Sequence, residues 1–107
     1  MPLEEREDEL NLREIRDIGK TIAVKLHEIF THSMSTKISV TFEVKLKKKE
    51  GEFNHILFTL TDSSEKPVAL SIIRDAALAC VRGNQHLLPS HVAVKISYIP
   101  TGGFHHE

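Results

Sequence analysis

The segment KISVTFEVKLKKKEGEFNHILFTLT (residues 37–61) decides the fold. Residues 37–47 alternate between apolar and polar side chains without a slip, and residues 53–61 repeat the alternation. A period of two is typical of a β-strand that is buried on one face. Because a short run with a glycine separates the two strands, we predict a β-hairpin. The inward side chains are expected to be Ile38, Val40, Phe42, Val44 and Leu46 on the first strand, and Ile56, Phe58 and Leu60 on the second.

The length of the loop sets the register of this hairpin. A two-residue turn at residues 50–51 would mix the apolar and polar faces of the two strands. A three-residue loop at residues 49–51 instead pairs Phe42 with Phe58 and keeps one face apolar. It also places Gly51 last, where such a loop needs a left-handed residue. The outer face then carries these opposed pairs: Lys45 opposite His55, and Lys47 opposite Phe53.

Two helices and a third strand are predicted around the hairpin. Residues 12–32 carry an apolar stripe with spacings of three and four, and Asn11 with Glu14 forms a capping box at its start. Residues 67–83 form the second helix, and residues 91–99 alternate again as a strand.

Two residues inside the predicted helices carry further information. Gly19 interrupts the first helix at a cost of roughly 1 kcal/mol relative to alanine, which a close approach of another helix or the sheet would explain. Pro67 suits the first turn of the second helix, and Gly83 suits its end.

These elements give the order α-β-β-α-β in a single α+β domain at residues 11–100. We expect a three-stranded, mainly antiparallel sheet with both helices packed on one face. A length of 107 residues fits one compact domain. Residues 1–10 are acidic and are expected to be frayed, and residues 101–107 are expected to form a flexible tail.

The second helix is predicted to contact more than the sheet. Its only charges are Arg74, Asp75 and Arg82, and a helix that is apolar nearly all round is buried on more than one side. The first helix or a second copy of the chain is expected to cover the apolar surface of this helix that the small sheet does not reach. Homodimers are common. The candidate interface residues are Ile15, Ile22, Leu26, Leu70, Ala77 and Val81.

Four lysines gather within residues 45–49 at the tip of the hairpin. Nucleic-acid binding on a small sheet needs cations for the phosphates and exposed aromatic rings for the bases. The outer face combines both, and its candidate contact residues are Lys45, Lys47, Lys48, Lys49, Phe53, His55 and Lys95. Lysines are also common on edge strands, where they discourage aggregation. Both interpretations stay open.

The sequence offers no convergent set of catalytic or metal-binding residues. Cys80 lies in the middle of the apolar second helix, where a thiol packs as a small hydrophobe with a raised pKa. The seven histidines show no metal-ligand spacing, and neither a paired carboxylate nor a glycine-rich phosphate loop occurs. We therefore predict no enzyme, no cofactor and no metal site.

Composition and charge describe an ordinary globular chain. With 40% hydrophobic residues, 27% charged residues and a net charge of −1, the surface as a whole is not built for nucleic acid. The N-terminus is acidic, unlike a secretory signal, and no apolar run reaches the length of a membrane span. A single cysteine fits a reducing compartment, so a cytoplasmic protein without membrane contact is expected.

Two functional hypotheses follow. The leading one is a small non-enzymatic adaptor or regulatory protein that acts through protein–protein contacts, as a homodimer or as a subunit of a complex. The alternative is a nucleic-acid-binding accessory protein that uses the lysine-rich hairpin and the outer face of the sheet. The position of Phe53 discriminates between them, because a buried Phe53 would remove the stacking surface that the alternative requires.

Overall fold

The computed structural model describes residues 3–102 of the chain, with side chains from Leu12 onward, so part of each predicted end lies outside the described residues. Its elements are α1 (Leu3–Glu28), a π-helical turn η1 (Ile29–Ser33), β1 (Ile38–Lys45), β2 (Asn54–Asp62), α2 (Leu70–Gly83), a 3₁₀ turn η2 (Gln85–Leu87) and β3 (Val92–Pro100). This is the predicted α-β-β-α-β order in a single α+β domain.

The three strands form one sheet in the order β1-β2-β3. β1 and β2 are antiparallel, whereas β2 and β3 are parallel, so the sheet is mixed rather than mainly antiparallel as predicted. The reason is the connection through α2, which carries the chain back to the level where β2 begins. A strand that follows such a crossover and pairs with the strand before it runs in the same direction.

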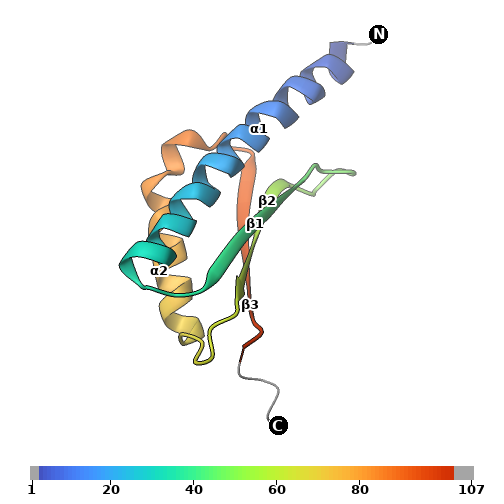
Figure 1. Ribbon diagram of the computed structural model, residues 1–107. Helices are drawn as coiled ribbons and strands as arrows, with labels where there is room; N and C mark the ends of the chain where they lie inside the picture. Colours follow the sequence, from blue (N-terminus) through green and yellow to red (C-terminus); the bar gives the residue numbers. More distant parts are fainter. Residues whose placement is uncertain (1–2, 103–107) are drawn as a thin grey trace.

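Both helices lie on one face of the sheet, and no element of residues 3–102 covers the other face (Figure 1). α1 packs mainly on β1, and its first turns project beyond the sheet, which gives the chain an elongated outline of 54 × 29 × 21 Å. The core between the layers includes Ile15, Ile22, Leu26, Phe30, Ile38, Ile56, Phe58, Leu60, Ile73, Ala77, Cys80 and Val92.

The hairpin has the register that the three-residue loop predicts. Phe42 pairs with Phe58, and the ladder ends with Lys45 opposite His55. Gly51 has a φ of +91°, the left-handed conformation predicted for it. The turn itself differs from the predicted three-residue loop, because the backbone N–H of Glu52 donates to the carbonyl oxygen of Lys49 at 3.2 Å and centres the turn on residues 50–51. Lys47 and Phe53 lie past the end of the ladder, so the pairing predicted for them is not formed as part of the sheet.

α1 begins nine residues before the predicted start at Leu12, because the structure places its first residue at Leu3. Asn11, predicted as the cap, therefore lies inside the helix. The segment LEEREDEL (residues 3–10), expected to be frayed, continues the helix in the structure. Leucine, glutamate and arginine are good helix formers, so the helix propagates through a position that a cap would otherwise mark.

α2 begins later than predicted, and Pro67 precedes the helix instead of occupying its first turn. The N-cap is Ala69, whose ψ of 141° is extended, and the first helical residue is Leu70. The hydroxyl of Tyr98 lies 2.9 Å from the carbonyl oxygen of Val68, and this contact with β3 engages the backbone just before the helix. The end of α2 at Gly83 agrees with the prediction.

Gly19 lies at a close contact between α1 and β1. A Cβ atom at this position would lie 2.7 Å from Cε2 of Phe42 on β1, closer than side-chain carbons pack. The glycine therefore allows the helix to rest on the ring of Phe42. This confirms the close approach that the interrupted helix pattern predicts.

Candidate functional site

The uncovered face of the sheet carries the outward residues of all three strands in rows. The first row, at the hairpin end, is Lys45, His55 and Ala93, and the second is Glu43, Leu57 and Lys95. The next rows are Thr41, Thr59 and Ser97, followed by Ser39, Thr61 and Ile99. Charge is thus concentrated at the hairpin end, and hydroxyl groups dominate the middle of the face.

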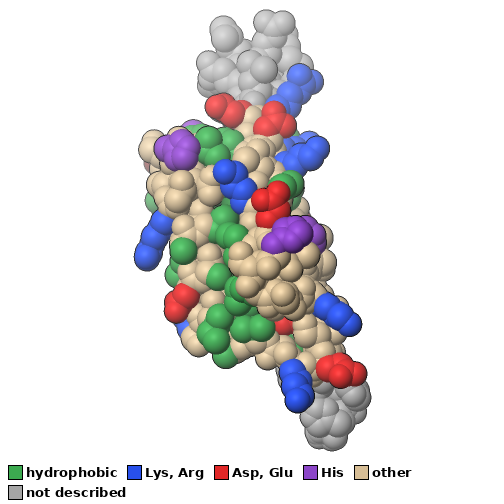
Figure 2. All heavy atoms as spheres, turned by 60° about the vertical axis from the view of Figure 1, so that its left-hand side comes forward, with side chains coloured by type: hydrophobic (Ala, Val, Ile, Leu, Met, Phe, Trp, Pro, Cys, Tyr) green, Lys and Arg blue, Asp and Glu red, His purple; other side chains and the backbone are tan. Residues whose placement is uncertain are grey.

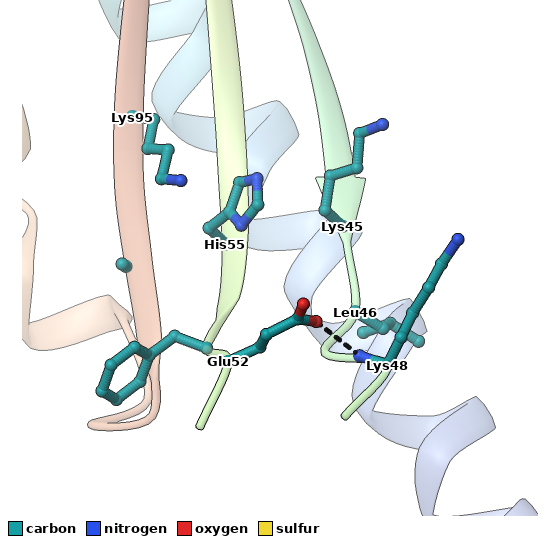
Figure 3. Close-up of a pocket in the computed structure, with 8 residues that line it drawn as sticks. Lys45, Leu46, Lys48, Glu52, His55 and Lys95 are labelled. Carbon is teal, nitrogen blue, oxygen red and sulfur yellow. Dashed lines mark hydrogen bonds between the residues drawn. The ribbon is translucent and has the colours of Figure 1, made fainter. Parts of the chain in front are cut away.

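A depression of about 360 Å³, here called the basic hollow, lies at the hairpin end of this face (Figure 3). Its lining residues are Lys45, Leu46, Lys48, Glu52, Phe53, His55, Ala93 and Lys95. In Figure 3 the side chains of Lys95, His55 and Lys45, one from each strand, lie beside one another on the same face. The hollow therefore depends on the pairing of all three strands.

Phe53 is outside the core, with 70% of its surface exposed, the largest fraction among the large exposed hydrophobic residues described. It lines the basic hollow together with Lys45 and His55. The structure therefore leaves an aromatic ring accessible beside cations, which is the arrangement that the nucleic-acid hypothesis requires.

The lysines of the hairpin divide into two groups. Lys45, Lys48 and Lys95 line the basic hollow, whereas Lys47 and Lys49 are exposed outside it. Only part of the lysine-rich tip therefore lies at the hollow. Its lysines have different neighbours, although they are adjacent in the sequence.

Two glutamates reduce the positive charge of the hollow. Glu43 lies 3.5 Å from the ammonium of Lys45, and both side chains are more than half exposed, so the pair contributes little to stability. A carboxylate oxygen of Glu52 accepts a hydrogen bond from the backbone N–H of Lys48 at 3.1 Å (Figure 3). Within residues 12–102, Lys48 and Lys95 form no ion pair, so both ammonium groups are available to an anion.

A second depression, here called the apolar groove, lies between α2 and β3 and also has a volume of about 360 Å³. Its lining residues are Leu70, Ile73, Arg74, Leu78, Val81, Val94, Ile96 and Tyr98. Leu70 and Leu78 remain 56% and 38% exposed. Figure 2, which faces the helical side, shows hydrophobic side chains gathered over the lower half of the body, where Figure 1 places the start of α2.

A partly buried polar cluster around Asp62 links the two walls of the apolar groove. Tyr98 lies with its hydroxyl 2.7 Å from Oδ2 of Asp62 and also close to the Val68 carbonyl oxygen. The backbone N–H of Ser64 donates to Oδ1 of Asp62 at 2.9 Å. These contacts tie the end of β2 and the segment before α2 to β3.

The same cluster shifts two pKa values. Burial acts to raise the pKa of the Asp62 carboxyl, but hydrogen bonds from Ser64 and Tyr98 outweigh it and hold that pKa below its ordinary value. Burial, and then the hydrogen bond to the Asp62 carboxylate, raise the pKa of Tyr98 well above its ordinary range. Asp62 is therefore charged and Tyr98 neutral around neutral pH.

The outer side of β3 is a free strand edge, because β3 pairs only with β2 within residues 3–102. β3 has nine residues, of which only Lys95 is charged, and its one proline, Pro100, is the last residue. Natural edge strands are usually guarded by charges, prolines or bulges. The edge of β3 therefore has little protection against pairing with another strand, and the apolar groove lies beside it.

Most of the interface residues predicted from the sequence are used inside the chain itself. Ile15, Ile22, Leu26 and Ala77 are at most 1% exposed, and Val81 is 8% exposed. They are buried because the small sheet and the two helices need these side chains for their common core. Leu70 alone of the predicted set is exposed, and Leu78, Val94 and Ile96 join it in the apolar groove. The pattern of the helix shows an excess of apolar surface, but not which side stays open.

Neither a reactive thiol nor a metal centre is found in the described part of the chain. Cys80 is buried, and burial raises the pKa of its thiol, as predicted. No group of three or more histidine, cysteine, aspartate or glutamate residues comes together there as a metal site. The described helices also lack a segment of the length and hydrophobicity needed to cross a membrane.

Comparison with known proteins assigns no family to this chain. No protein-family model matches it, and a search of curated proteins finds no significant similarity. The two surfaces described above are therefore the basis on which a function is inferred.

Proposed function

We propose that this protein is a small adaptor or regulatory protein that acts through protein–protein contacts as a homodimer joined along β3. The observation that carries the proposal is the apolar groove beside the free edge of β3. A strand edge presents unpaired backbone N–H and C=O groups, and another extended strand satisfies them best. The groove then accepts side chains from the helical side of that strand.

The groove opens away from α1, toward the edge of β3. Leu70, Arg74 and Leu78 follow one another at helical spacing on one flank of α2 and line the groove. The other flank, at Ala79 and Cys80, lines a separate depression together with residues of α1. A partner that pairs with β3 would therefore meet Leu70 and Leu78 without displacing α1.

A second copy of the chain has the properties that this edge requires. β3 of the second copy is an extended strand with the same alternation, so two copies can pair antiparallel about a two-fold axis. With the axis at Ile96, Lys95 of each copy faces Ser97 of the other, so no like charges are opposed. The result would be a six-stranded sheet in which the exposed apolar flanks of the two α2 helices cover each other.

The test is sedimentation velocity over a range from low to high micromolar protein. We expect a monomer–dimer equilibrium that Leu78→Glu shifts to monomer, because the change places a charge in a buried interface. The loss of a buried leucine and the added charge should weaken association by about 100-fold or more.

Val24→Glu is the matched control, since Val24 is an exposed apolar residue at 51% on α1, away from the groove. It should leave the dimer intact, and circular dichroism should show that both variants are folded. A strictly monomeric chain at high micromolar concentration would contradict the homodimer and leave the groove to a strand of a different protein. Equal losses in both variants would contradict an interface at β3.

A further inference from the structure

We infer that the basic hollow binds single-stranded nucleic acid, with Phe53 as the surface on which a base stacks and with Lys45, Lys48 and Lys95 as phosphate contacts. This surface is on the uncovered face of the sheet, whereas the apolar groove is on the helical side. The inference therefore stands or falls independently of the proposed homodimer.

The first argument is the placement of the aromatic ring. Exposed hydrophobic residues that are scattered singly need no explanation, but Phe53 lines a depression that also contains three lysines. Every nucleobase offers a π-face, so one accessible ring beside cations suits a single strand of any sequence. Ala93, the smallest side chain lining the hollow, leaves room for a flat base beside the ring.

The second argument is the spacing of the charges across the sheet. Lys45 and Lys95 come from the two outer strands, with His55 between them on β2 (Figure 3). Lys45 and Lys95 lie in neighbouring rows of the face, two strand spacings apart, so their backbones are about 12 Å apart and the two side chains extend from opposite sides of the hollow. A backbone that crosses the sheet next to the stacked base would meet a cation from each outer strand.

The third argument decides between a single strand and a duplex. Three lysines in the hollow are opposed by Glu52 in its lining and by Glu43 beside Lys45, so the local excess of positive charge is small. A duplex binder that relies on phosphates makes about six to ten such contacts. Stacking must therefore supply much of the affinity here, and only unpaired bases can stack on Phe53.

The middle of the uncovered face provides a path for the rest of the strand. The row Thr41, Thr59 and Ser97 presents hydroxyl groups to the same side as the basic hollow. Hydroxyl side chains commonly bond phosphate and sugar oxygens and carry no sequence information. We therefore expect binding without strong sequence preference.

The test is fluorescence anisotropy with labelled oligo(U) and oligo(dT) of about ten nucleotides, a length suited to one small domain. Duplex DNA and poly-glutamate serve as competitors. We expect weak binding to both single strands, with a log–log salt slope of about −2 for three phosphate contacts. Phe53→Leu should weaken binding about tenfold because it keeps an apolar side chain but removes the π-face, and Phe53→Tyr should restore it.

Lys95→Glu should weaken binding about tenfold or more, whereas Lys66→Glu, the same charge change at an exposed lysine outside the hollow, should have little effect. Leu78→Glu should bind as the unaltered chain does, which separates this inference from the homodimer. The inference is overturned by the absence of binding at low salt, or by unchanged affinity in Phe53→Leu. Displacement of oligo(U) by poly-glutamate or duplex DNA as effectively as by oligo(dT) would overturn it too, because it would show a surface selective only for charge.

Discussion

β1 and β3 are both edge strands of the same sheet, but they are protected in different ways. β1 has Glu43 and Lys45 within it and is followed by a run of lysines, and α1 packs on it. β3 has one charged residue, Lys95, and its neighbour α2 leaves an apolar groove beside it. The edge at β1 thus carries charges of both signs, whereas the edge at β3 carries a single charge and is open to a further strand.

The adjacent lysines of the hairpin also fall into two groups. Lys47 and Lys49 lie outside the basic hollow and are exposed, as charges that discourage edge-to-edge pairing commonly are. Lys45 and Lys48 line the hollow with Lys95, which comes from the opposite edge of the sheet. A charged side chain can discourage strand pairing wherever it is exposed to solvent. A charged side chain that binds a ligand must lie close to other side chains that contact the same ligand.

The packing of α1 on β1 is tested by a substitution that fills the space between them. We expect Gly19→Val to lower the free energy of unfolding by about 2 kcal/mol, because a Cβ there would lie 2.7 Å from the ring of Phe42. A shift of that ring would disturb its contact with Phe58, whose ring centroid lies 6.0 Å away. Urea denaturation measures the change.

Lys20→Val is the control for this prediction, because Lys20 is the next residue on α1 and is exposed. It should change the free energy of unfolding by less than about 0.5 kcal/mol. Helix propensity alone would make Gly19→Val slightly stabilising and Lys20→Val slightly destabilising. If Gly19→Val did not lower the free energy of unfolding, the tight packing of α1 on β1 would be refuted.

The attachment of β3 is tested at the polar cluster of Asp62, Ser64 and Tyr98. We expect Asp62→Asn to lower the free energy of unfolding by about 1.5 kcal/mol at pH 7, because it removes the charge that accepts hydrogen bonds from Ser64 and Tyr98. The folded-state pKa of Asp62 lies below its ordinary value of about 3.9, so this stabilisation is fully present above about pH 4. It is lost as the pH falls through the lowered pKa.

Urea denaturation of both proteins at pH 7 and at pH 3 checks this dependence. The difference between Asp62→Asn and the unaltered chain should shrink at the lower pH. A difference that stays constant would mean that Asp62 acts only through its shape and not through its charge.

Local patterns in the sequence predict the strands and the hairpin well. The period of two in residues 37–61 and the left-handed Gly51 are properties of neighbouring residues, so the register follows from them. The same register places Lys45 and His55 together on the outer face. The end of α2 at Gly83 is equally local.

Features that depend on distant contacts are not predicted. The direction of β3 follows from the crossover through α2, and the late start of α2 follows a hydrogen bond from Tyr98 to Val68, residues far apart in the sequence. Ala93 enters the basic hollow only because β3 is parallel to β2. The apolar groove is not predicted for a related reason, since the spacing of apolar residues on α2 does not indicate which of them the sheet will bury.

The smallest expected effect comes from changing the charges on the two edge strands, β1 and β3. It also tests most directly which of the two edges forms the interface. In the proposed dimer, Lys95 of each copy faces Ser97 of the other, so Ser97→Lys would oppose two pairs of like charges. We expect association to weaken by about tenfold, which corresponds to roughly 1.4 kcal/mol. Ser97→Glu should instead strengthen association, and Thr41→Lys, in the same row on β1, should leave it unchanged. Sedimentation velocity measures all three, and a dimer equally sensitive to Thr41→Lys would place the interface at β1 and reverse the roles assigned to the two edges.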